Sequence, residues 1–168
     1  MTLPIMRINI LPATEKDIAQ IQAIVAQSWP ATYGKILSPE QLTYMVDLFY
    51  SDQSLKKQFS EGHQFYILSE GQDAIGFMDI EKINAAYCKL HKIYLLPAHQ
   101  GKGYGKALLD YAIHKARQME ATQLKLNVNR HNKALGFYQR LGFKIAQQVD
   151  NPIGQGYYMN DYVMELSL

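Results

Sequence analysis

Seven segments of the chain are rich in apolar residues, several with the alternation of a strand that buries one face. They are residues 5–11, 64–69, 74–81, 87–96, 123–128, 143–149 and 157–166. Glu70–Asp73, between the second and third segments, predicts a hairpin turn because Gly and Asp favour tight turns. The sequence NPIGQG at residues 151–156 predicts the turn between the last two.

Other segments place apolar residues at helical spacing. Thr14 and Asp17 have the spacing of a capping box, and the helix that they start is expected to end at about Gln27. Ser38 is expected to cap a second helix, with Gln41 closing a second capping box. The remaining helices are a short one from about Ser54 to before Gly62, one from Gly103 to about Gln118, and one over 132–141 closed by Gly142.

The order of the main elements is β-α-α-β-β-β-α-β-α-β-β. Strands with helices interposed late in the chain predict an α/β (α+β) domain, with helices packed on a mixed sheet. No internal repeat, low-complexity stretch or Gly/Ser-rich linker interrupts the pattern. We therefore expect residues 1–168 to form a single domain, which suits a chain of about 100–200 residues.

The composition agrees with a globular protein of this size. Apolar residues make up 48% of the 168 positions and charged residues 19%, which excludes a disordered tail or a fibrous repeat. No apolar run approaches the roughly 20 residues of a membrane span, and the first residues lack the pattern of a signal peptide. The single Cys88 excludes an internal disulfide and a Cys-rich zinc site, so we expect a cytoplasmic protein.

The net charge of +2 hides an uneven distribution. Residues 82–149 carry twelve Lys and Arg against Asp110 and Glu120, a balance of +10, and the rest of the chain has a balance of −8. Such asymmetry predicts an anionic ligand on one part and a cationic one on the other. Chance is the alternative, since neighbours in sequence need not be neighbours in space.

The strongest chemical signal is the glycine-rich segment Gln100–Lys106, which lies between a predicted strand and a predicted helix. Glycines let several backbone N–H groups converge, and the helix N-terminus and the lysines add positive charge, so the segment suits a phosphate. A Walker loop is excluded because Gln100 and Ala107 stand where it needs Gly and Ser or Thr. A dinucleotide fingerprint is excluded because Lys106 replaces its last Gly or Ala.

Leu90–Leu109 closely resembles the acetyl-CoA motif of the GNAT superfamily of N-acetyltransferases, which is a strand, Gln/Arg-x-x-Gly-x-Gly/Ala and a helix. Residues 124–143 resemble the second motif of that family, a strand followed by Asn-x-x-Ala-x-x-Phe-Tyr-x-x-x-Gly-Phe. Both motifs stand in the right order and cover about a third of the chain. The resemblance implies a GNAT-like, mostly antiparallel central sheet and an acetyl-CoA-dependent N-acetyltransferase that transfers the acetyl group directly to an amine.

The resemblance also implies the residues that bind acetyl-CoA. The glycine-rich segment would bind the pyrophosphate, the end of the preceding strand would run beside the pantetheine arm, and a backbone N–H near Leu95 would stabilise the oxyanion. Asn132 matches the family residue that hydrogen-bonds the CoA arm, although it also suits a helix N-cap. The full set is Ile93, Tyr94, Leu95, Gln100, Gly101, Lys102, Gly103, Tyr104, Gly105, Lys106, Asn132 and Tyr138.

Tyr138 matches the family tyrosine that protonates the departing thiolate, and a core aromatic is the alternative. The attacking amine must first lose a proton, because an ammonium group with a pKa of about 10 is protonated at neutral pH and has no lone pair for the attack. The resemblance does not identify the base. Glu81, Asp79 and His91 are candidates, each with a structural alternative, and Glu81 is the one that we favour.

The acceptor site is expected from the first helices and the last strands. Trp29 and Tyr33 are candidate substrate residues, because aromatic rings near carboxylates suit a cationic amine, and core packing is the alternative. Residues 31–42 and 156–168 are similar to bacterial spermine/spermidine N-acetyltransferases of the PaiA type. The acceptor is therefore expected to be a small-molecule amine, such as a polyamine, or an amine of a protein or peptide.

Other functions have weaker support. A non-catalytic acyl-CoA sensor on the same fold is the main alternative to an enzyme. The five histidines show no paired ligand spacing, so we expect no metal. We also expect no nucleic-acid or membrane partner, because the lysines are spread over both faces of the predicted elements. A homodimer is left open.

Overall fold

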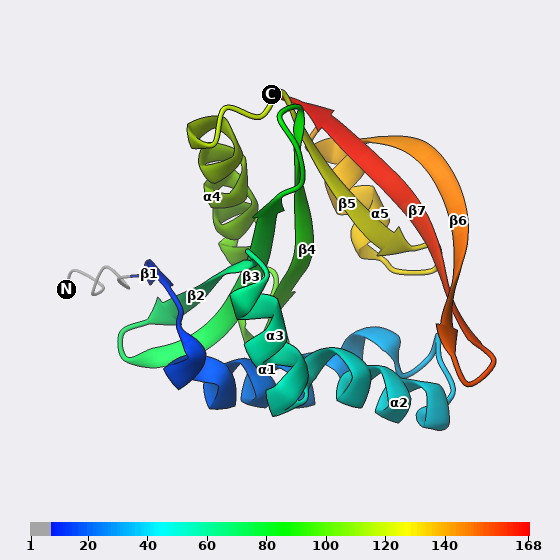
Figure 1. The fold of residues 1–168 in the computed structure, drawn as a ribbon. Coiled ribbons are helices and arrows are strands. Elements are labelled where there is room, and N and C mark those ends of the chain that lie inside the picture. The colour runs from blue at the N-terminus through cyan, green and yellow to red at the C-terminus, as the bar shows by residue number, and fades with distance from the viewer. Residues whose placement is uncertain (1–7) are drawn as a thin grey trace.

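The computed structural model describes residues 8–168 and contains one seven-stranded sheet in the order β1-β2-β3-β4-β5-β7-β6 (Figure 1). The strands are β1 (Ile8–Pro12), β2 (Gln64–Glu70), β3 (Asp73–Lys82), β4 (Tyr87–Leu95), β5 (Gln123–Asn129), β6 (Lys144–Gly154) and β7 (Tyr157–Ser167). Only β4 and β5 pair in parallel, which confirms the mixed, mostly antiparallel sheet. Residues 5–7 of the first predicted strand lie outside the described residues.

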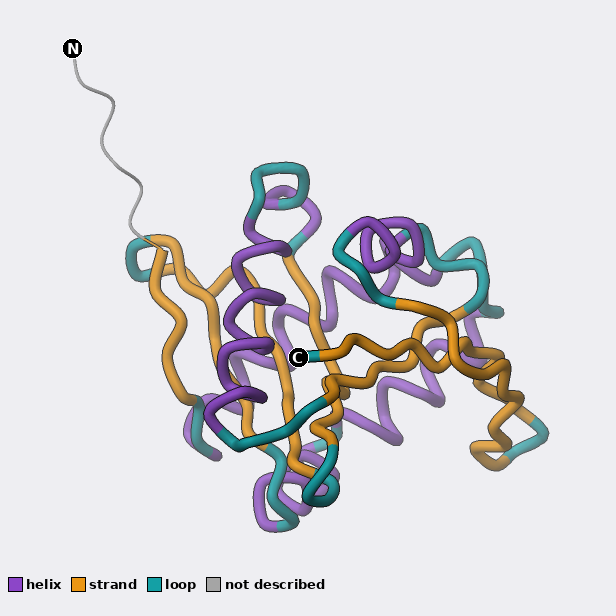
Figure 2. Tube along the Cα trace, turned by 90° about the horizontal axis from the view of Figure 1, so that it is seen from above, coloured by secondary structure: helices purple, strands orange, loops and turns teal. Residues whose placement is uncertain are grey.

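Helices cover both faces of the sheet, as the view from above shows with strands in orange and helices in purple (Figure 2). One hydrophobic cluster, around Ile21, Leu55 and Phe77, lies between the sheet and the first three helices. The other, around Leu108 and Leu124, lies under the last two. The helices are α1 (Ile18–Tyr33), α2 (Pro39–Tyr50), α3 (Asp52–Ser60), α4 (Tyr104–Gln118) and α5 (Ala134–Arg140). None of the helices in residues 8–168 has the length and apolar character that crossing a membrane requires.

The first helical region differs from its prediction in two ways. Three helices precede β2, because the short helix that the predicted order did not count is α3. The predicted end of the first helix at Gln27 is wrong, because α1 continues through Pro30 to Tyr33. Pro30 lacks the N–H that would bond to the carbonyl four residues earlier, but burial of Trp29 holds the segment helical. Gly34 then closes the helix by donating to the Pro30 carbonyl at 2.9 Å.

The capping predictions had different outcomes. The capping box of Thr14 and Asp17 is confirmed. Ser38 also caps its helix, accepting a hydrogen bond from the Gln41 N–H at 3.1 Å. The second half of that box is wrong, because the Gln41 amide instead donates to the Tyr158 carbonyl at 2.9 Å. This hydrogen bond links α2 to the start of β7.

The last two strands are longer than predicted. β6 runs through Pro152 to Gly154, and the turn is reduced to Gln155 and Gly156. Pro152 is tolerated because β6 is an edge strand, whose outer N–H groups need no partner.

Gly76 on β3 lies opposite Leu95 of β4, with no room for a side chain. A Cβ there would lie 2.9 Å from the Tyr94 carbonyl oxygen and 2.6 Å from Leu95 Cδ2. We expect Gly76→Ala to lower the free energy of unfolding by about 1–3 kcal/mol, as overpacking does. Gly136→Ala in α5 is the matched control, because its Cβ would meet only the Arg140 side chain and Ala favours a helix by about 1 kcal/mol. Urea unfolding of both variants checks this, and equal midpoints would contradict it.

Candidate active site

The two central strands separate partway along their length. β4 and β5 pair only as far as Leu90, which faces Leu126. Beyond this point β4 stays paired with β3 but leaves β5, and the two diverge toward α1 and α2 (Figure 1). The second half of β4 therefore has one side free of a neighbouring strand.

A β-bulge in β4 lies where the strands separate. Asp79 of β3 faces Lys92, whereas the next residue of β3 faces Leu90, so His91 is the extra residue. A bulge bends its strand and changes where side chains point. It brings two consecutive side chains, His91 and Lys92, to the same cavity instead of to opposite faces.

The free side of β4 presents backbone N–H groups. The Leu96 N–H donates to the Ile75 carbonyl of β3 at 2.8 Å. Successive N–H groups of an extended strand point to opposite sides, so that of Leu95 points away from β3, toward the space that β5 has left, and so does that of Ile93. This is the arrangement that an oxyanion donor requires, and it places the predicted segment Ile93–Leu95 beside the opening.

The glycine-rich segment lies between β4 and α4 as predicted. Gly101 and Gly103 have φ of +77° and +85°, a conformation that only Gly adopts readily. No described atom lies within 4 Å of where a Cβ would stand on either residue. The first four N–H groups of a helix have no partner within it, and here Ala107 is the first to bond back, to the Gly103 carbonyl at 3.1 Å. The open space and unpaired donors fit a phosphate group.

The side chains of this segment contact other protein groups or solvent, so the space beside Gly101 and Gly103 is bordered mainly by backbone. Lys106 pairs with Asp110 at 2.7 Å along the exposed surface of α4. Tyr104 turns toward the β2–β3 hairpin, where its hydroxyl donates to Glu70 at 2.5 Å. The Gln100 amide lies 3.4 Å from the Leu95 carbonyl, and Lys102 is exposed.

Asn132 lies just before the helix that carries Tyr138. Its side-chain oxygen Oδ1 accepts a hydrogen bond from the Ala134 N–H at 2.9 Å. The N-cap position of α5 is Lys133 rather than Asn132, because the helix begins at Ala134, two residues later than expected. Asn132 also lies beside the Tyr33 hydroxyl. Burial raises the pKa of Tyr33 to about 12, and hydrogen bonds from Tyr94 and Asn132 oppose that rise.

Tyr138 is a buried residue of the α4–α5 face of the sheet. It packs against Phe137 and Phe143 and is 7% exposed. Burial raises the pKa of its phenol well above the ordinary value, and the neighbouring Tyr33 adds to the rise. The phenol therefore keeps its proton at neutral pH, as a proton donor must.

A cavity of about 340 Å³ opens on the opposite face, between α1, α2 and the separated strands. Both predicted substrate residues line it. The Trp29 ring packs against the Tyr33 ring at a tilt of 59°, with centroids 4.8 Å apart, and the hydroxyls of Tyr33 and Tyr94 are 2.9 Å apart. The prediction placed these residues in a loop, but they lie on the last turns of α1. Trp29 and Tyr33 thus line the cavity together with Tyr94 of β4, which the sequence had predicted to bind acetyl-CoA.

The charges around the cavity do not separate as the sequence suggested. Lys89 and Lys92, from the basic segment, line the cavity, and Asp161 of β7 is the carboxylate among the described lining residues. Asp161 is 3% exposed, and its Oδ2 has no hydrogen-bond partner in residues 8–168. Burial raises its pKa, against the opposing effects of Asn127, Lys89 and Arg130. The expected separation of charge is therefore wrong at this cavity, where one buried carboxylate lies among basic residues.

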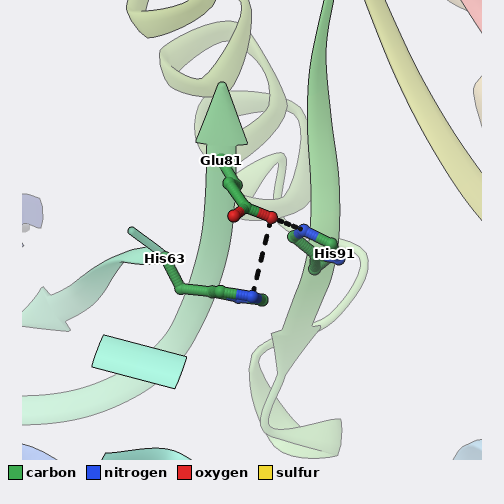
Figure 3. Close-up of side chains that lie close together, drawn as sticks. All are labelled: His63, Glu81 and His91. Atoms are coloured by element: carbon green, nitrogen blue, oxygen red, sulfur yellow. Dashed lines mark hydrogen bonds and ion pairs between the residues drawn. The ribbon is translucent and has the colours of Figure 1, made fainter. Parts of the chain in front are cut away.

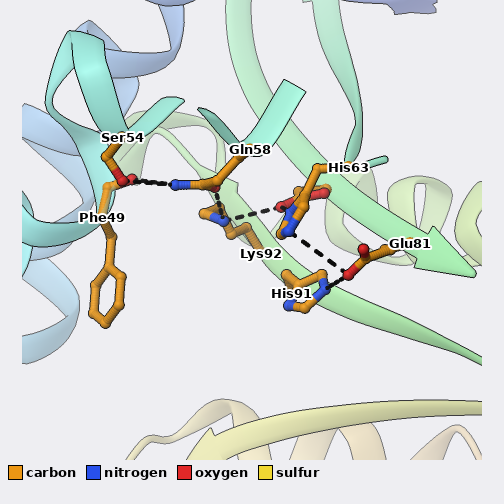
Figure 4. A network of polar contacts seen from close by, with 8 residues as sticks. Phe49, Ser54, Gln58, His63, Glu81, His91 and Lys92 are labelled. Carbon is orange, nitrogen blue, oxygen red and sulfur yellow. Dashed lines mark hydrogen bonds and ion pairs between the residues drawn. The ribbon is translucent and has the colours of Figure 1, made fainter. Parts of the chain in front are cut away.

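The three candidate bases belong to one group of side chains beside the cavity, which we call the histidine–carboxylate cluster. Its members are His63, Asp79, Glu81, His91 and Lys92 (Figures 3 and 4). Sequence reasoning missed His63, which precedes β2 and carries no motif. The ligand atoms of His63, Glu81 and His91 lie within 4.8 Å of one another, although these residues have no metal-site spacing in the sequence.

A polar network anchors this cluster to α3. The Gln58 side chain accepts a hydrogen bond from Lys92 at 2.6 Å and donates to the Phe49 carbonyl at 2.8 Å (Figure 4). Lys92 in turn donates to Asp79 at 2.9 Å. Burial opposes ionisation of Asp79, but the His63 hydrogen bond and the Lys92 charge outweigh burial and lower its pKa.

Known proteins share this architecture. The sequence model of the acetyltransferase (GNAT) family matches residues 19–143. The spermidine N(1)-acetyltransferase of Thermoplasma acidophilum is 30% identical over 146 residues, which cover 83% of this chain and 90% of the relative. The ribosomal protein bS18-alanine N-acetyltransferase of Haemophilus influenzae is 29% identical over 136 residues, covering 81% and 88%. The structure of the PaiA N-acetyltransferase of T. acidophilum in complex with coenzyme A matches with a TM-score of 0.85 at 25% identity, covering 97% of this chain and 100% of that one. The chain belongs to the GNAT family and is an N-acetyltransferase.

Proposed function

We propose that this protein transfers the acetyl group of acetyl-CoA directly to a primary amine of a small molecule, with a polyamine as the first acceptor class to test. The observation that carries the proposal is the opening between β4 and β5, which has the glycine-rich segment at the end of β4 and an aromatic cavity beside α1 and α2. Direct transfer is supported because Cys88 is fully buried and burial raises its thiol pKa, which disfavours a cysteine-bound acetyl group.

The segment from Gln100 to Lys106 would hold the pyrophosphate of acetyl-CoA by backbone N–H groups at the start of α4. A Cβ at position 103 would combine strain at a positive φ with intrusion into this space. Asn132 and the free edge of β4 would hold the pantetheine arm. The relative solved with coenzyme A supports this assignment through its match over nearly the whole chain.

Gly103→Ala tests the loop. We expect the affinity for CoA to fall by about tenfold or more, because the N–H groups can no longer converge on the phosphates. Gly71→Ala is the matched control: it has a positive φ of +63° and equally open surroundings, but it lies in the β2–β3 turn. Isothermal titration with CoA should separate the two variants, while thermal unfolding should show similar losses of stability. Equal CoA affinity in both would contradict the loop assignment.

In the transfer step, the amine nitrogen forms a bond to the acetyl carbon and the carbon–sulfur bond breaks. The Leu95 N–H would stabilise the negative charge on the carbonyl oxygen. Tyr138 would give its proton to the departing thiolate, and the proton that the nitrogen loses as the amide forms would restore the phenol. The buried surroundings that raise the phenol pKa also disfavour a bare thiolate, so the transfer becomes easier than the two solution pKa values suggest.

Tyr138→Phe removes this proton and little else, because the ring packing is kept. We expect kcat to fall by about 10- to 100-fold, with CoA affinity changed by less than about threefold. Tyr111→Phe on α4 is the control and should keep wild-type kcat. Steady-state kinetics and CoA titration check both quantities. A Tyr138→Phe variant with full kcat would remove Tyr138 from the mechanism.

The acceptor would enter the cavity beside Trp29 and Tyr33 as a cation. Aromatic faces attract an ammonium group, and the unpaired Oδ2 of Asp161 can accept its hydrogen bond. Counting Asp79, Glu81 and Asp161 against Lys89 and Lys92 leaves one negative charge in excess, which matches one ammonium at a time. The spermidine acetyltransferase among the relatives supports a small amine, and the relative that acetylates a ribosomal-protein alanine is the reason to include peptides in the test.

Asp161→Asn should raise KM for a cationic amine by about tenfold and leave CoA affinity unchanged, because a hydrogen bond to a charged group is lost. Asp47→Asn, at an exposed position of α2, is the control. The measurement is thiol release from acetyl-CoA against a panel of polyamines, other small amines and peptides. An unchanged KM would place the ammonium elsewhere. If no amine of the panel causes thiol release while CoA still binds, the result would favour a non-catalytic acyl-CoA-binding protein.

A further inference from the structure

The hydrogen atoms of the histidine–carboxylate cluster can be assigned from its contacts. His63 Nδ1 lies 2.6 Å from Asp79 Oδ2, and an ionised carboxylate only accepts, so Nδ1 carries a hydrogen. His91 Nε2 lies 2.8 Å from Glu81 Oε1 and donates in the same way. Burial lowers the pKa of His91 to about 4, so its ring is neutral at pH 7 and its Nδ1 has a free lone pair.

One contact in the cluster lacks a hydrogen. His63 Nε2 faces Glu81 Oε1 at 3.6 Å, and both are acceptors when His63 is neutral (Figure 3). The charges show the same deficit, because Asp79 and Glu81 bring two negative charges and Lys92 brings one positive charge. One added proton on His63 Nε2 would give a hydrogen bond to each carboxylate and neutralise the group.

A metal ion is the other species that could fill this gap. The rings of His63 and His91 are stacked, with centroids 4.4 Å apart and planes 25° apart. An imidazole binds a metal along the lone pair in its own ring plane, and two stacked rings hold their lone pairs in separate planes rather than aiming them at one point from different sides. The cluster as it stands therefore suits a proton better than a metal.

We propose that this cluster receives the proton of the acceptor's ammonium, with His91 as its entry point and His63 as its resting place. The inference rests on the proposed function. His91 lines the cavity and takes the proton at Nδ1, its Nε2 hydrogen passes to Glu81, and Glu81 passes it to His63. The amine becomes neutral, Glu81 returns to its charged form, and His63 becomes an imidazolium held by two carboxylates. Glu81, which does not line the cavity among the described residues, acts through the histidines.

The pH dependence follows from the groups around this path. His91 is faced by Asp79 and Glu81 of β3, by His63 before β2, and by Lys92 of its own strand. Lys89 of β4 and Asp161 of β7 also line the cavity and interact with each other electrostatically. With the cluster intact, kcat/KM should level off once the cluster has lost its extra proton. Without it, only the free amine reacts, so the rate should rise about tenfold per pH unit toward the amine pKa near 10.

The test compares His91→Asn and His63→Asn with His114→Asn, an exposed position on α4. We expect the first two to lower kcat/KM at pH 7 by about 100-fold and to recover most of it near pH 10, while the control follows the wild type. Glu81→Gln keeps a hydrogen-bond acceptor but removes the charge that favours protonation, so its acid limb should shift to lower pH and its plateau should fall. CoA affinity and thermal unfolding verify that each variant is folded, and Glu81→Gln serves if a histidine variant is not. Parallel profiles in wild type and His91→Asn would overturn the proposal while leaving the proposed function intact.

Two further measurements complete the test. Long-range ¹H–¹⁵N spectra of the imidazoles should show His91 neutral with its hydrogen on Nε2 and His63 with its hydrogen on Nδ1, even in a protein that acetylates nothing. The opposite tautomers would overturn the path. Dialysis against EDTA should leave the wild-type rate unchanged, and a loss that Zn²⁺ restores would assign the cluster to a metal instead.

Discussion

The separation of β4 from β5 is the constraint on which the rest of the site depends. A parallel pair normally continues along both strands, because each unpaired N–H and C=O in a sheet loses a hydrogen bond. Here pairing stops at Leu90, and the extra residue His91 bends β4 away from its neighbour. The hydrogen bonds lost there leave a row of backbone N–H donors along the edge of β4 without a partner strand. Those donors are what a carbonyl oxygen needs as it becomes negative.

The same bend decides where side chains point. With a regular strand, Lys92 would follow Leu90 into the core under α4, where a charged group would be buried without a partner. The bulge turns Lys92 toward α3 instead, where Gln58 and Asp79 hold it. His91 is brought to the cavity by the same shift. One irregularity in backbone pairing therefore supplies both the opening and the polar groups beside it.

Local features were predicted from the sequence and distant combinations were not. The glycine-rich segment was predictable because its chemistry lies in consecutive backbone groups, and the order of strands and helices followed from local periodicity. The length of α1 was not, because burial of Trp29 outweighs the local effect of Pro30. The histidine–carboxylate cluster combines residues of β3 and β4 with His63, which precedes β2. Its geometry depends on a β-bulge, and no residue type in the sequence indicates that bulge. The charge asymmetry misled for the same reason, because strand pairing brings the basic residues Lys89 and Lys92 to the cavity that Trp29 and Tyr33 also line.

In the proposed mechanism, the opening also separates the proton donor for the thiolate from the proton acceptor for the amine. Tyr138 belongs to the cluster under α4 and α5, whereas His91 lines the cavity between α1 and α2. Burial already keeps each group in the form that its proposed step needs, because it raises the pKa of the Tyr138 phenol and lowers that of the His91 imidazole. Their positions on opposite faces would let the phenol act on the leaving sulfur and the imidazole on the incoming amine. The proposed transfer would then carry the acetyl carbon from sulfur to nitrogen through the opening with no covalent enzyme intermediate, which agrees with the burial of Cys88 outside the described cavity lining.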